Sequence, residues 1–205
     1  MNKTLGIVLA AIGGVLLIAG ISLMIGYNGL VTKREMVKTK WADVQAQYQR
    51  RMDLIPNVVT TVKTAADTEQ RILQGVVNAR SAWATAKMGG DINAQIKAAS
   101  GFDSAMSHLL VTVEAYPQLK SIEGFGDLTT NLEGTENRVA VARRDYNEAV
   151  RVYNTASMVF PGSMIAALFS FAPFQSFEAD AGAQNAPKVD FNSPPLEAPA
   201  VEIKK

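Results

Sequence analysis

The stretch LGIVLAAIGGVLLIAGISLMI, residues 5–25, decides how this chain is built, because it contains no charged side chain. About 20 apolar residues in an α-helix, at about 1.5 Å per residue, span the roughly 30 Å hydrocarbon core of a bilayer. The run exceeds the roughly 7–15 residues of a signal-peptide core, and no A-x-A-like cleavage site follows it. The absence of cysteine excludes a lipoprotein anchor. We predict a retained single-pass anchor, with an uncleaved or atypically cleaved signal sequence as the alternative.

The remaining composition limits the classes of partner and chemistry. About 150 residues follow the anchor before a proline-rich tail, which is enough for one domain with a core. The net charge is +1 and no block of like charge is present, so a nucleic-acid partner is not expected. Without cysteine there are no disulfides, thiolate zinc sites or thiol nucleophiles.

An apolar stripe with steps of three, four and seven residues continues directly after the anchor. It consists of Leu30, Val37, Trp41, Val44, Tyr48 and Ile55. Because no Gly or Pro interrupts residues 31–55, anchor and stripe are predicted to form one helix of roughly 45–50 residues. The GYNG junction, residues 26–29, is the expected bend, since Gly has little helix preference.

Three further stripes predict three further helices, separated at Pro56, at Gly89-Gly90-Asp91 and at Pro117, and closed by Pro161-Gly162. The second stripe comprises Val59, Val62, Ala66, Ile72 or Leu73, Val76, Arg80 and Trp83; the third comprises Ile92, Ile96, Phe102, Met106, Leu109, Val113 and Tyr116; the fourth comprises Phe125, Leu128, Leu132, Thr135, Val139, Ala142, Tyr146, Ala149, Tyr153 and Ala156. Long helices with tight connections pack antiparallel. The predicted fold is all-α, a single N-terminal transmembrane helix that continues into an elongated antiparallel bundle of about four long helices.

The chain is expected to divide into five parts. These are a short N-terminus (residues 1–4), the anchor (5–25), the helical bundle (26–157), an apolar segment (158–177) and a disordered Pro/Ala-rich tail (178–205). The apolar segment has no charge, and Pro161 and Pro173 prevent it from forming a second span. It is either a short helix folded back onto the bundle or a membrane-surface or subunit-contact element, and we expect its contact to support assembly more than the monomer fold.

No constellation of residues indicates chemistry. His108 is the only histidine, and one imidazole without thiolates or a paired histidine makes no recognisable metal site. No phosphate-binding loop or nucleophile elbow occurs, and Trp41 and Trp83 lie in apolar stripes. We therefore predict no catalytic, cofactor-binding or metal-binding residues, no small-molecule substrate and no enzymatic activity.

Two charged segments deserve an interpretation. Arg50, Arg51 and Asp53 lie at the expected break between helices, where they either pair locally or bind a partner. The alternating charges of residues 138–151 are typical of a solvated or inter-helix face.

Several sequence blocks resemble the LemA family of bacterial membrane proteins. They are Gly26–Val31, Gln47–Val59, Thr61–Lys63, Asn78–Arg80, Glu114–Lys120, Leu132–Arg138, Val141–Asn147, Tyr153–Thr155, Phe160–Gly162 and Ala186–Phe191. The resemblance covers nearly all of residues 1–191 in order. The chain departs from the family pattern at Thr64–Asp67 and at Ser104–His108, and the tail after Phe191 is additional.

The resemblance implies an anchored helical bundle without an accepted enzymatic activity or cofactor, and it supplies no catalytic residue. Family members often occur together with membrane proteases and other membrane proteins, and one branch resembles a magnetosome membrane component. The predicted function is a scaffold that self-associates as a homo-oligomer in the lipid bilayer and organises a membrane region or complex. The alternative is an adaptor or regulator of a membrane protease or sensor, with a membrane protein partner docked on Arg50, Arg51 and Asp53.

The orientation of the bundle has two opposing indications. Lys33, Arg34, Lys38 and Lys40 follow the anchor whereas Lys3 precedes it, which favours a cytoplasmic bundle. Some family relatives replace the anchor with a lipoprotein signal, which favours the outer side, and long domains translocate largely regardless of charge. We predict a bacterial cytoplasmic (inner) membrane protein with an extracytoplasmic or periplasmic bundle.

Overall fold

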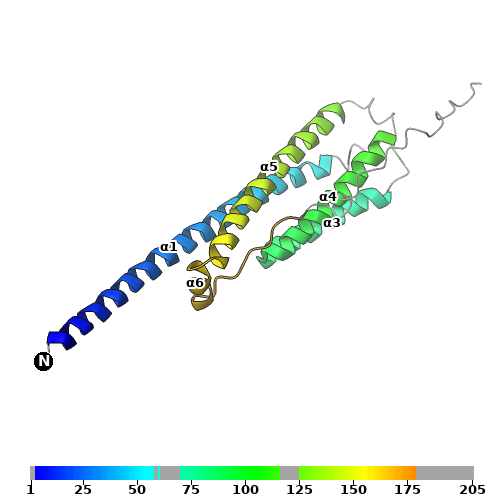
Figure 1. Ribbon diagram of the computed structural model, residues 1–205. Coiled ribbons are helices and arrows are strands. Elements are labelled where there is room, and N and C mark those ends of the chain that lie inside the picture. Colours follow the sequence, from blue (N-terminus) through cyan, green and yellow to red (C-terminus); the bar gives the residue numbers. More distant parts are fainter. Residues whose placement is uncertain (1–2, 58–59, 61–69, 116–124, 179–205) are drawn as a thin grey trace, which may run out of the picture.

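The computed structural model describes residues 3–57, 60, 70–115 and 125–178, and within these ranges it is helical without any strand. The helices are α1 (Lys3–Asp53), α3 (Gln70–Gly89), α4 (Ile92–Ala115), α5 (Phe125–Met158) and α6 (Gly162–Leu168). Four are long, and α6 has only 7 residues. The predicted all-α class, with a long apolar N-terminal helix that continues into packed helices, is confirmed (Figure 1).

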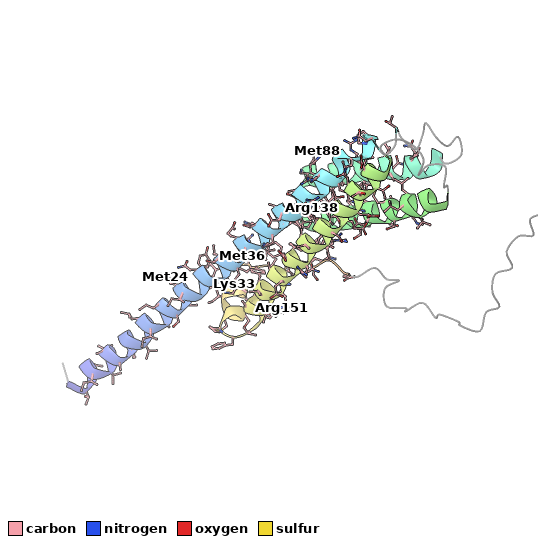
Figure 2. The ribbon with its side chains drawn as sticks, turned by 90° about the horizontal axis from the view of Figure 1, so that it is seen from above. Met24, Lys33, Met36, Met88, Arg138 and Arg151 are labelled. Atoms are coloured by element: carbon pink, nitrogen blue, oxygen red, sulfur yellow. The ribbon has the colours of Figure 1, made fainter. Side chains whose placement is uncertain are left out.

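Helix α1 is one continuous helix of 51 residues, about 76 Å long at 1.5 Å per residue. Its N-terminal part is long and apolar enough to cross a membrane, with a mean hydropathy of 2.6 and no buried residue in that window. Figure 2 shows Met24 on the part of α1 that stands clear of the other helices, and Met36 where α1 runs beside α5. The chain therefore has one candidate membrane span among its described residues, which continues directly into the bundle.

Residues 26–29, where a bend is expected, do not interrupt α1, which is helical from Lys3 to Asp53. The glycine serves a close approach instead. A Cβ added at Gly26 would collide with the Cδ1 atom of Ile165, so the Ile165 side chain lies directly over Gly26 where α6 packs against α1.

The main core forms between α1 and α5, which run antiparallel. All six residues of the predicted α1 stripe are buried, together with Leu132, Val139, Tyr146 and Tyr153 of α5. The rings of Trp41 and Tyr146 meet across this seam with centroids 5.1 Å apart. The three-and-four-residue spacing thus predicted the buried faces of both helices correctly.

Helices α3 and α4 form a hairpin beside the membrane-distal half of α1 (Figure 1), which it contacts through the side chains of Trp83, Gln95 and Asp103. Gly90 makes the turn with a φ of 73°, a conformation that glycine adopts without strain. Asp91 caps α4 as expected, since its Oδ1 accepts a hydrogen bond of 3.0 Å from the Asn93 amide. Trp83 stacks on Tyr48 of α1 at 4.9 Å.

Parts of the second, third and fourth stripes can be compared with the structure. Leu73, Val76 and Trp83 are buried, but Arg80 is exposed because its charged end stays in water. The residues whose side chains lie outside the described set are Val59, Val62, Ala66, Ile72, Val113, Tyr116, Phe125 and Leu128. The tail beyond Glu178 also lies outside it.

The segment that follows α5 turns back along the bundle. Helix α6 packs against both α1 and α5, and Gly162 is required at its start because a Cβ would collide with the Ala156 carbonyl oxygen. Ser170 has a φ of 56°, which ends α6 and redirects the chain. Residues 171–177, called the strap below, then run in extended form back along α5 (Figure 1).

The apolar segment therefore has two distinct parts. Ile165, Ala166, Phe171 and Phe177 belong to the hydrophobic core, and Phe174 packs against it. These residues stabilise the monomer, which differs from the expectation that the segment mainly supports assembly. The remaining large apolar side chains are exposed, namely Met158, Val159, Phe160, Met164, Leu168 and Phe169, which are called the tip below.

Candidate functional site

Two asparagines of α5 hold the strap with paired hydrogen bonds. Asn154 accepts from the Phe174 amide at 3.0 Å and donates to the Phe174 carbonyl at 2.8 Å. Asn147 makes the same pair with Phe177, at 2.8 Å and 3.0 Å. A primary amide suits this role because it offers a donor and an acceptor side by side. The backbone of the strap is thus hydrogen-bonded as it would be beside a neighbouring β-strand, but its partners are the side chains of Asn147 and Asn154.

The register of the strap follows from two repeat lengths. Asn147 and Asn154 are seven residues apart on a helix, which is about 10.5 Å at 1.5 Å per residue. Phe174 and Phe177 are three residues apart on an extended chain, which is about 10 Å at 3.3 Å per residue. Because these distances agree, a heptad on α5 can bind every third residue of the strap.

The tyrosines that precede the two asparagines repeat the same pattern. The Tyr146 hydroxyl donates to the Gln175 carbonyl at 2.8 Å, and the Tyr153 hydroxyl donates to the Ala172 carbonyl at 3.0 Å. Burial raises the pKa of Tyr146 to about 12 and also raises the pKa of Tyr153. Both phenols therefore stay protonated, as donors, throughout the physiological pH range.

A polar cluster joins three helices at the distal end of the core. Asp103 of α4 accepts a hydrogen bond from Arg51 of α1 at Oδ1 (3.0 Å) and one from Tyr48 of α1 at Oδ2 (2.7 Å), and Oδ2 also lies 3.0 Å from Arg143 of α5. Glu136 lies 3.6 Å from Arg51 and adds a second carboxylate. Burial, with a smaller contribution from the Asp103 charge, raises the pKa of Tyr48 far above its usual value.

This cluster also reaches the strap. The Arg143 guanidinium lies 4.3 Å from the centroid of the Phe177 ring, and Arg51 lies 5.8 Å from that of Phe102. Asp103 therefore orients the cation on which the last strap residue stacks. The arrangement connects the α3–α4 hairpin, the α1–α5 pair and the strap in one set of contacts.

The charged corner at Arg50, Arg51 and Asp53 does not form a single surface. The Arg51 side chain is only 4% exposed and is bound inside the cluster, whereas Arg50 and Asp53 are exposed. Asp53 accepts a hydrogen bond from Gln49. Arg51 pairs within the chain, but with Asp103 of α4 and Glu136 of α5 and not with its neighbours in the sequence.

The alternating charges of residues 138–151 divide between the two expected roles. Arg143 and Asp145 make contacts between helices, the latter with Lys40 of α1 at 3.5 Å. Arg151 and Glu148 form an exposed pair on α5 itself, at 2.6 Å.

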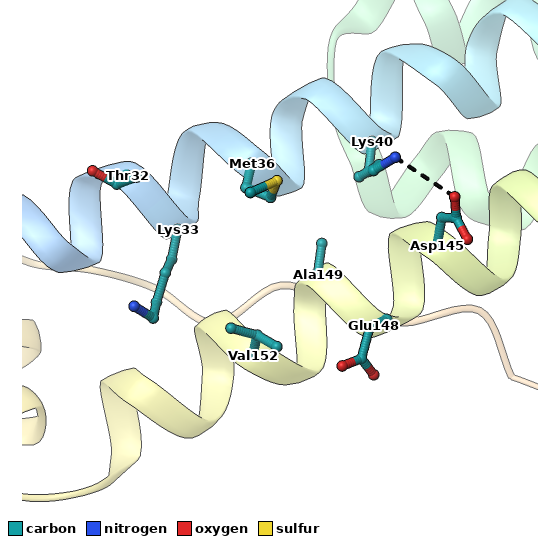
Figure 3. Close-up of a pocket in the computed structure, with 8 residues that line it drawn as sticks. All are labelled: Thr32, Lys33, Met36, Lys40, Asp145, Glu148, Ala149 and Val152. Atoms are coloured by element: carbon teal, nitrogen blue, oxygen red, sulfur yellow. Dashed lines mark ion pairs between the residues drawn. The ribbon is translucent and has the colours of Figure 1, made fainter.

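The side of the α1–α5 pair that faces away from the strap carries an open groove of about 450 Å³ (Figure 3). Its α1 wall consists of Thr32, Lys33, Met36 and Lys40, and its α5 wall consists of Asp145, Glu148, Ala149 and Val152. At 100° per residue, Met36 and Lys40 lie on one side of the buried seam of α1, and the strap contacts Arg34 and Trp41 lie on the other. The strap covers one side of the pair and the groove remains open on the other.

The remaining candidate residues have structural positions. Trp41 and Trp83 are buried in the core, and His108 is exposed. Among the described residues, no three His, Asp or Glu side chains gather where they could hold a metal ion.

Comparison with known proteins agrees with this architecture. The LemA family model matches residues 40–191, which include most of the bundle and the whole strap. The chain belongs to the LemA family. In this LemA protein the Tyr146-Asn147 and Tyr153-Asn154 pairs are the residues that bind the strap, which gives those two sequence blocks a structural role.

Curated relatives extend the comparison to magnetosome proteins. Magnetosome protein MamQ 2 of Paramagnetospirillum magneticum is 26% identical, over 77% of this chain and 66% of its own length. Magnetosome protein MamQ of Magnetospirillum gryphiswaldense is 27% identical, over 76% of this chain and 66% of its own length. The match thus spans slightly less than two thirds of each relative.

Sequence reasoning missed the strap and the Asp103 cluster. A signal for the strap exists, because the Tyr-Asn dipeptides are seven residues apart and Phe171, Phe174 and Phe177 recur every third residue. No comparable signal marks Asp103. Its partner Arg51 lies 52 residues before it in the sequence, and its partner Arg143 lies 40 residues after it.

Proposed function

We propose that this LemA protein is a non-enzymatic, membrane-anchored scaffold that self-associates through the groove side of the α1–α5 pair and so organises a membrane region. The observation that carries the proposal is the groove itself. It has an apolar floor, with Met36 54% and Val152 39% exposed, on the one long side of the pair that the strap does not cover. Exposed apolar faces of this kind mark association surfaces.

The charges at the groove fit a second copy of the same chain. The α1 wall carries Lys33 and Lys40, whereas the α5 wall carries Asp145 and Glu148. Copies anchored in one bilayer with one orientation are related by an axis normal to the membrane, and rotation about that axis keeps every residue at its height. A twofold axis along the groove places α1 of one copy beside α5 of the other, so that the Lys40–Asp145 pairs of the two chains, each 3.5 Å within its own chain, would meet in one network.

The resulting contact has the geometry of a four-helix bundle. Two α1–α5 pairs would pack groove to groove, with Met36 and Val152 at the centre and the charges at the rim. The magnetosome names of the relatives support a structural role at a membrane-associated assembly. For the alternative adaptor role, Arg50 and Asp53 remain as the exposed residues of the proposed docking surface, because Arg51 is buried.

Single-cysteine cross-linking tests this proposal, since the natural chain has no cysteine. A Met36→Cys variant of the full chain, treated in native membranes with a short bis-maleimide, is expected to give a band at twice the 22.0 kDa chain mass. Ser81→Cys, exposed on α3, is the matched control and should stay a single chain.

Equal cross-linking of the two variants would contradict the groove contact. A stoichiometric second protein joined to the Met36→Cys position, with no self-linked product, would overturn self-association and favour the adaptor role.

A further inference from the structure

The tip forms an exposed apolar surface at one end of the bundle. Its six side chains are between 49% and 79% exposed, and Phe160 is the most exposed of them. No charged residue occurs anywhere between Arg151 and Glu178. An apolar surface of this extent, without charges to keep it in water, indicates a contact that the isolated chain does not satisfy.

The tip lies at the height where α1 leaves the bundle. Ile165 of α6 packs against Gly26, and the Tyr27 ring lies 4.8 Å from Phe169 and 5.6 Å from Phe171. Figure 1 shows α6 at the end of the bundle from which the N-terminal part of α1 emerges. Gly26 is the first residue after the apolar run of residues 5–25, and the first charged residue that follows is Lys33.

That height coincides with the surface of the bilayer. The apolar run of residues 5–25 is about 31 Å long at 1.5 Å per residue, and it fills the roughly 30 Å hydrocarbon core. Residues 26–29 then lie in the interface, where Tyr27 suits the aromatic belt. Lys33 and Arg34 lie about 10 Å further along α1, at the level of the lipid headgroups.

We propose that the tip is a second membrane contact, which inserts Met158, Val159, Phe160, Met164, Leu168 and Phe169 into the interface of the leaflet that α1 enters from the bundle. The occupant is lipid because the tip continues the exposed apolar surface of α1, where Leu16 and Ile25 are each 66% exposed. With 7 residues, α6 is too short to span and lies in the interface as an amphipathic element, its buried side on α1 and α5.

A second membrane contact would fix the tilt of α1 relative to the bilayer. A single helix can tilt freely in a bilayer, whereas two contacts on one rigid body define its angle to the membrane. The α1–α5 pair and its groove would then stand at a fixed angle in every copy. This inference needs only the membrane anchor and does not depend on self-association.

The test uses single-cysteine variants of the full chain labelled with an environment-sensitive fluorophore and reconstituted in nanodiscs. Phe160→Cys reports on the tip, Leu17→Cys on the span, and Met88→Cys on a site that is 82% exposed at the α3–α4 turn. Lipids with nitroxide labels near the headgroup quench probes in the interface. We expect strong quenching and blue-shifted emission at the Phe160→Cys position, and neither at the Met88→Cys position.

Two results would overturn the inference. If the probe at Phe160→Cys has the water-like emission of Met88→Cys, the tip does not contact lipid. If it is shielded from an aqueous quencher but is not quenched by the lipid nitroxide, a protein covers the tip. Nanodiscs with one chain each separate this result from self-association, because a quenched tip in a single-chain disc supports the membrane contact alone.

Discussion

The tip and the strap are neighbouring segments of similar apolar composition with opposite surroundings. The strap places Phe171, Phe174 and Phe177 on the α1–α5 seam, where Asn154 and Asn147 satisfy the backbone groups of the last two. The tip leaves Phe160 79% exposed at the end of the bundle. The difference arises from the backbone, because an extended chain with a three-residue repeat matches the heptad of α5, and the short turn and α6 do not.

The comparison shows that apolar content alone does not assign a segment to the core. An apolar side chain becomes part of the core only where neighbouring polar backbone groups are also satisfied. Substitutions in the strap and in its supporting cluster should therefore reduce stability, whereas substitutions in the tip should change contacts with the surroundings.

The largest effect is expected from Asp103→Ala, which removes the shared partner of Arg51 and Arg143. Removing one partner of a buried ion pair typically costs about 3–5 kcal/mol, and Arg51, whose side chain is 4% exposed, would keep the longer 3.6 Å contact with Glu136. Thermal or denaturant unfolding of the full chain in detergent measures the loss. Glu133→Ala, at an exposed position of α5, is the control and should change stability by less than about 0.5 kcal/mol.

A direct contrast of strap and tip comes from two identical substitutions. Phe177→Ala should reduce the free energy of unfolding by about 3 kcal/mol, because the ring packs on Trp41, Tyr146 and Arg143. Phe160→Ala should change it by less than about 0.5 kcal/mol. Similar losses for both variants in the same denaturant titration would abolish the distinction between strap and tip.

The hydrogen bonds of the strap predict a smaller effect. Asn154→Ala removes both bonds to Phe174 and should cost about 2 kcal/mol, since each bond contributes about 1 kcal/mol. Hydrogen exchange at the Phe174 amide should accelerate in this variant. The exposed Asn137→Ala serves as the reference, and an unchanged exchange rate at Phe174 would mean that the paired bonds do not hold the strap.

The smallest effect concerns pH. Because the pKa of Tyr146 is raised to about 12, the unfolded state loses this proton from about pH 10 while the folded state retains it. Stability should therefore fall as pH rises from about 10 to 12, and Tyr146 should add no pH dependence below about pH 10. Tyr146→Phe should lose about 1 kcal/mol at neutral pH and decline less steeply in alkali. Identical alkaline slopes for the two proteins would contradict this assignment.

The sequence predicted the elements better than their connections. The stripe of Leu30, Val37 and Trp41 and that of Val139 and Tyr146 identified the buried faces, because helical periodicity is a local property. The close contact of Gly26 with Ile165 could not be predicted in this way, because Ile165 belongs to a distant element.

The Asp103 cluster and the groove could not be predicted because their residues lie far apart in the sequence. The partners of Asp103 belong to α1 and α5. The groove forms where Met36 of α1 and Val152 of α5 lie on facing walls. The strap was only partly predictable from the sequence. Its repeats of seven and three were visible in the residues, but their match depends on comparing a helical rise with an extended one.

The most direct test of the scaffold proposal is the native mass of the full chain extracted in mild detergent with its boundary lipids. The account predicts an assembly whose protein mass is a multiple of the 22.0 kDa chain, and a shift to a single chain for Val152→Glu, which adds a charge to the groove floor beside Glu148. Ser81→Glu on the exposed face of α3 should leave the mass unchanged. A single-chain mass for the unmodified protein, without partners, would contradict the account.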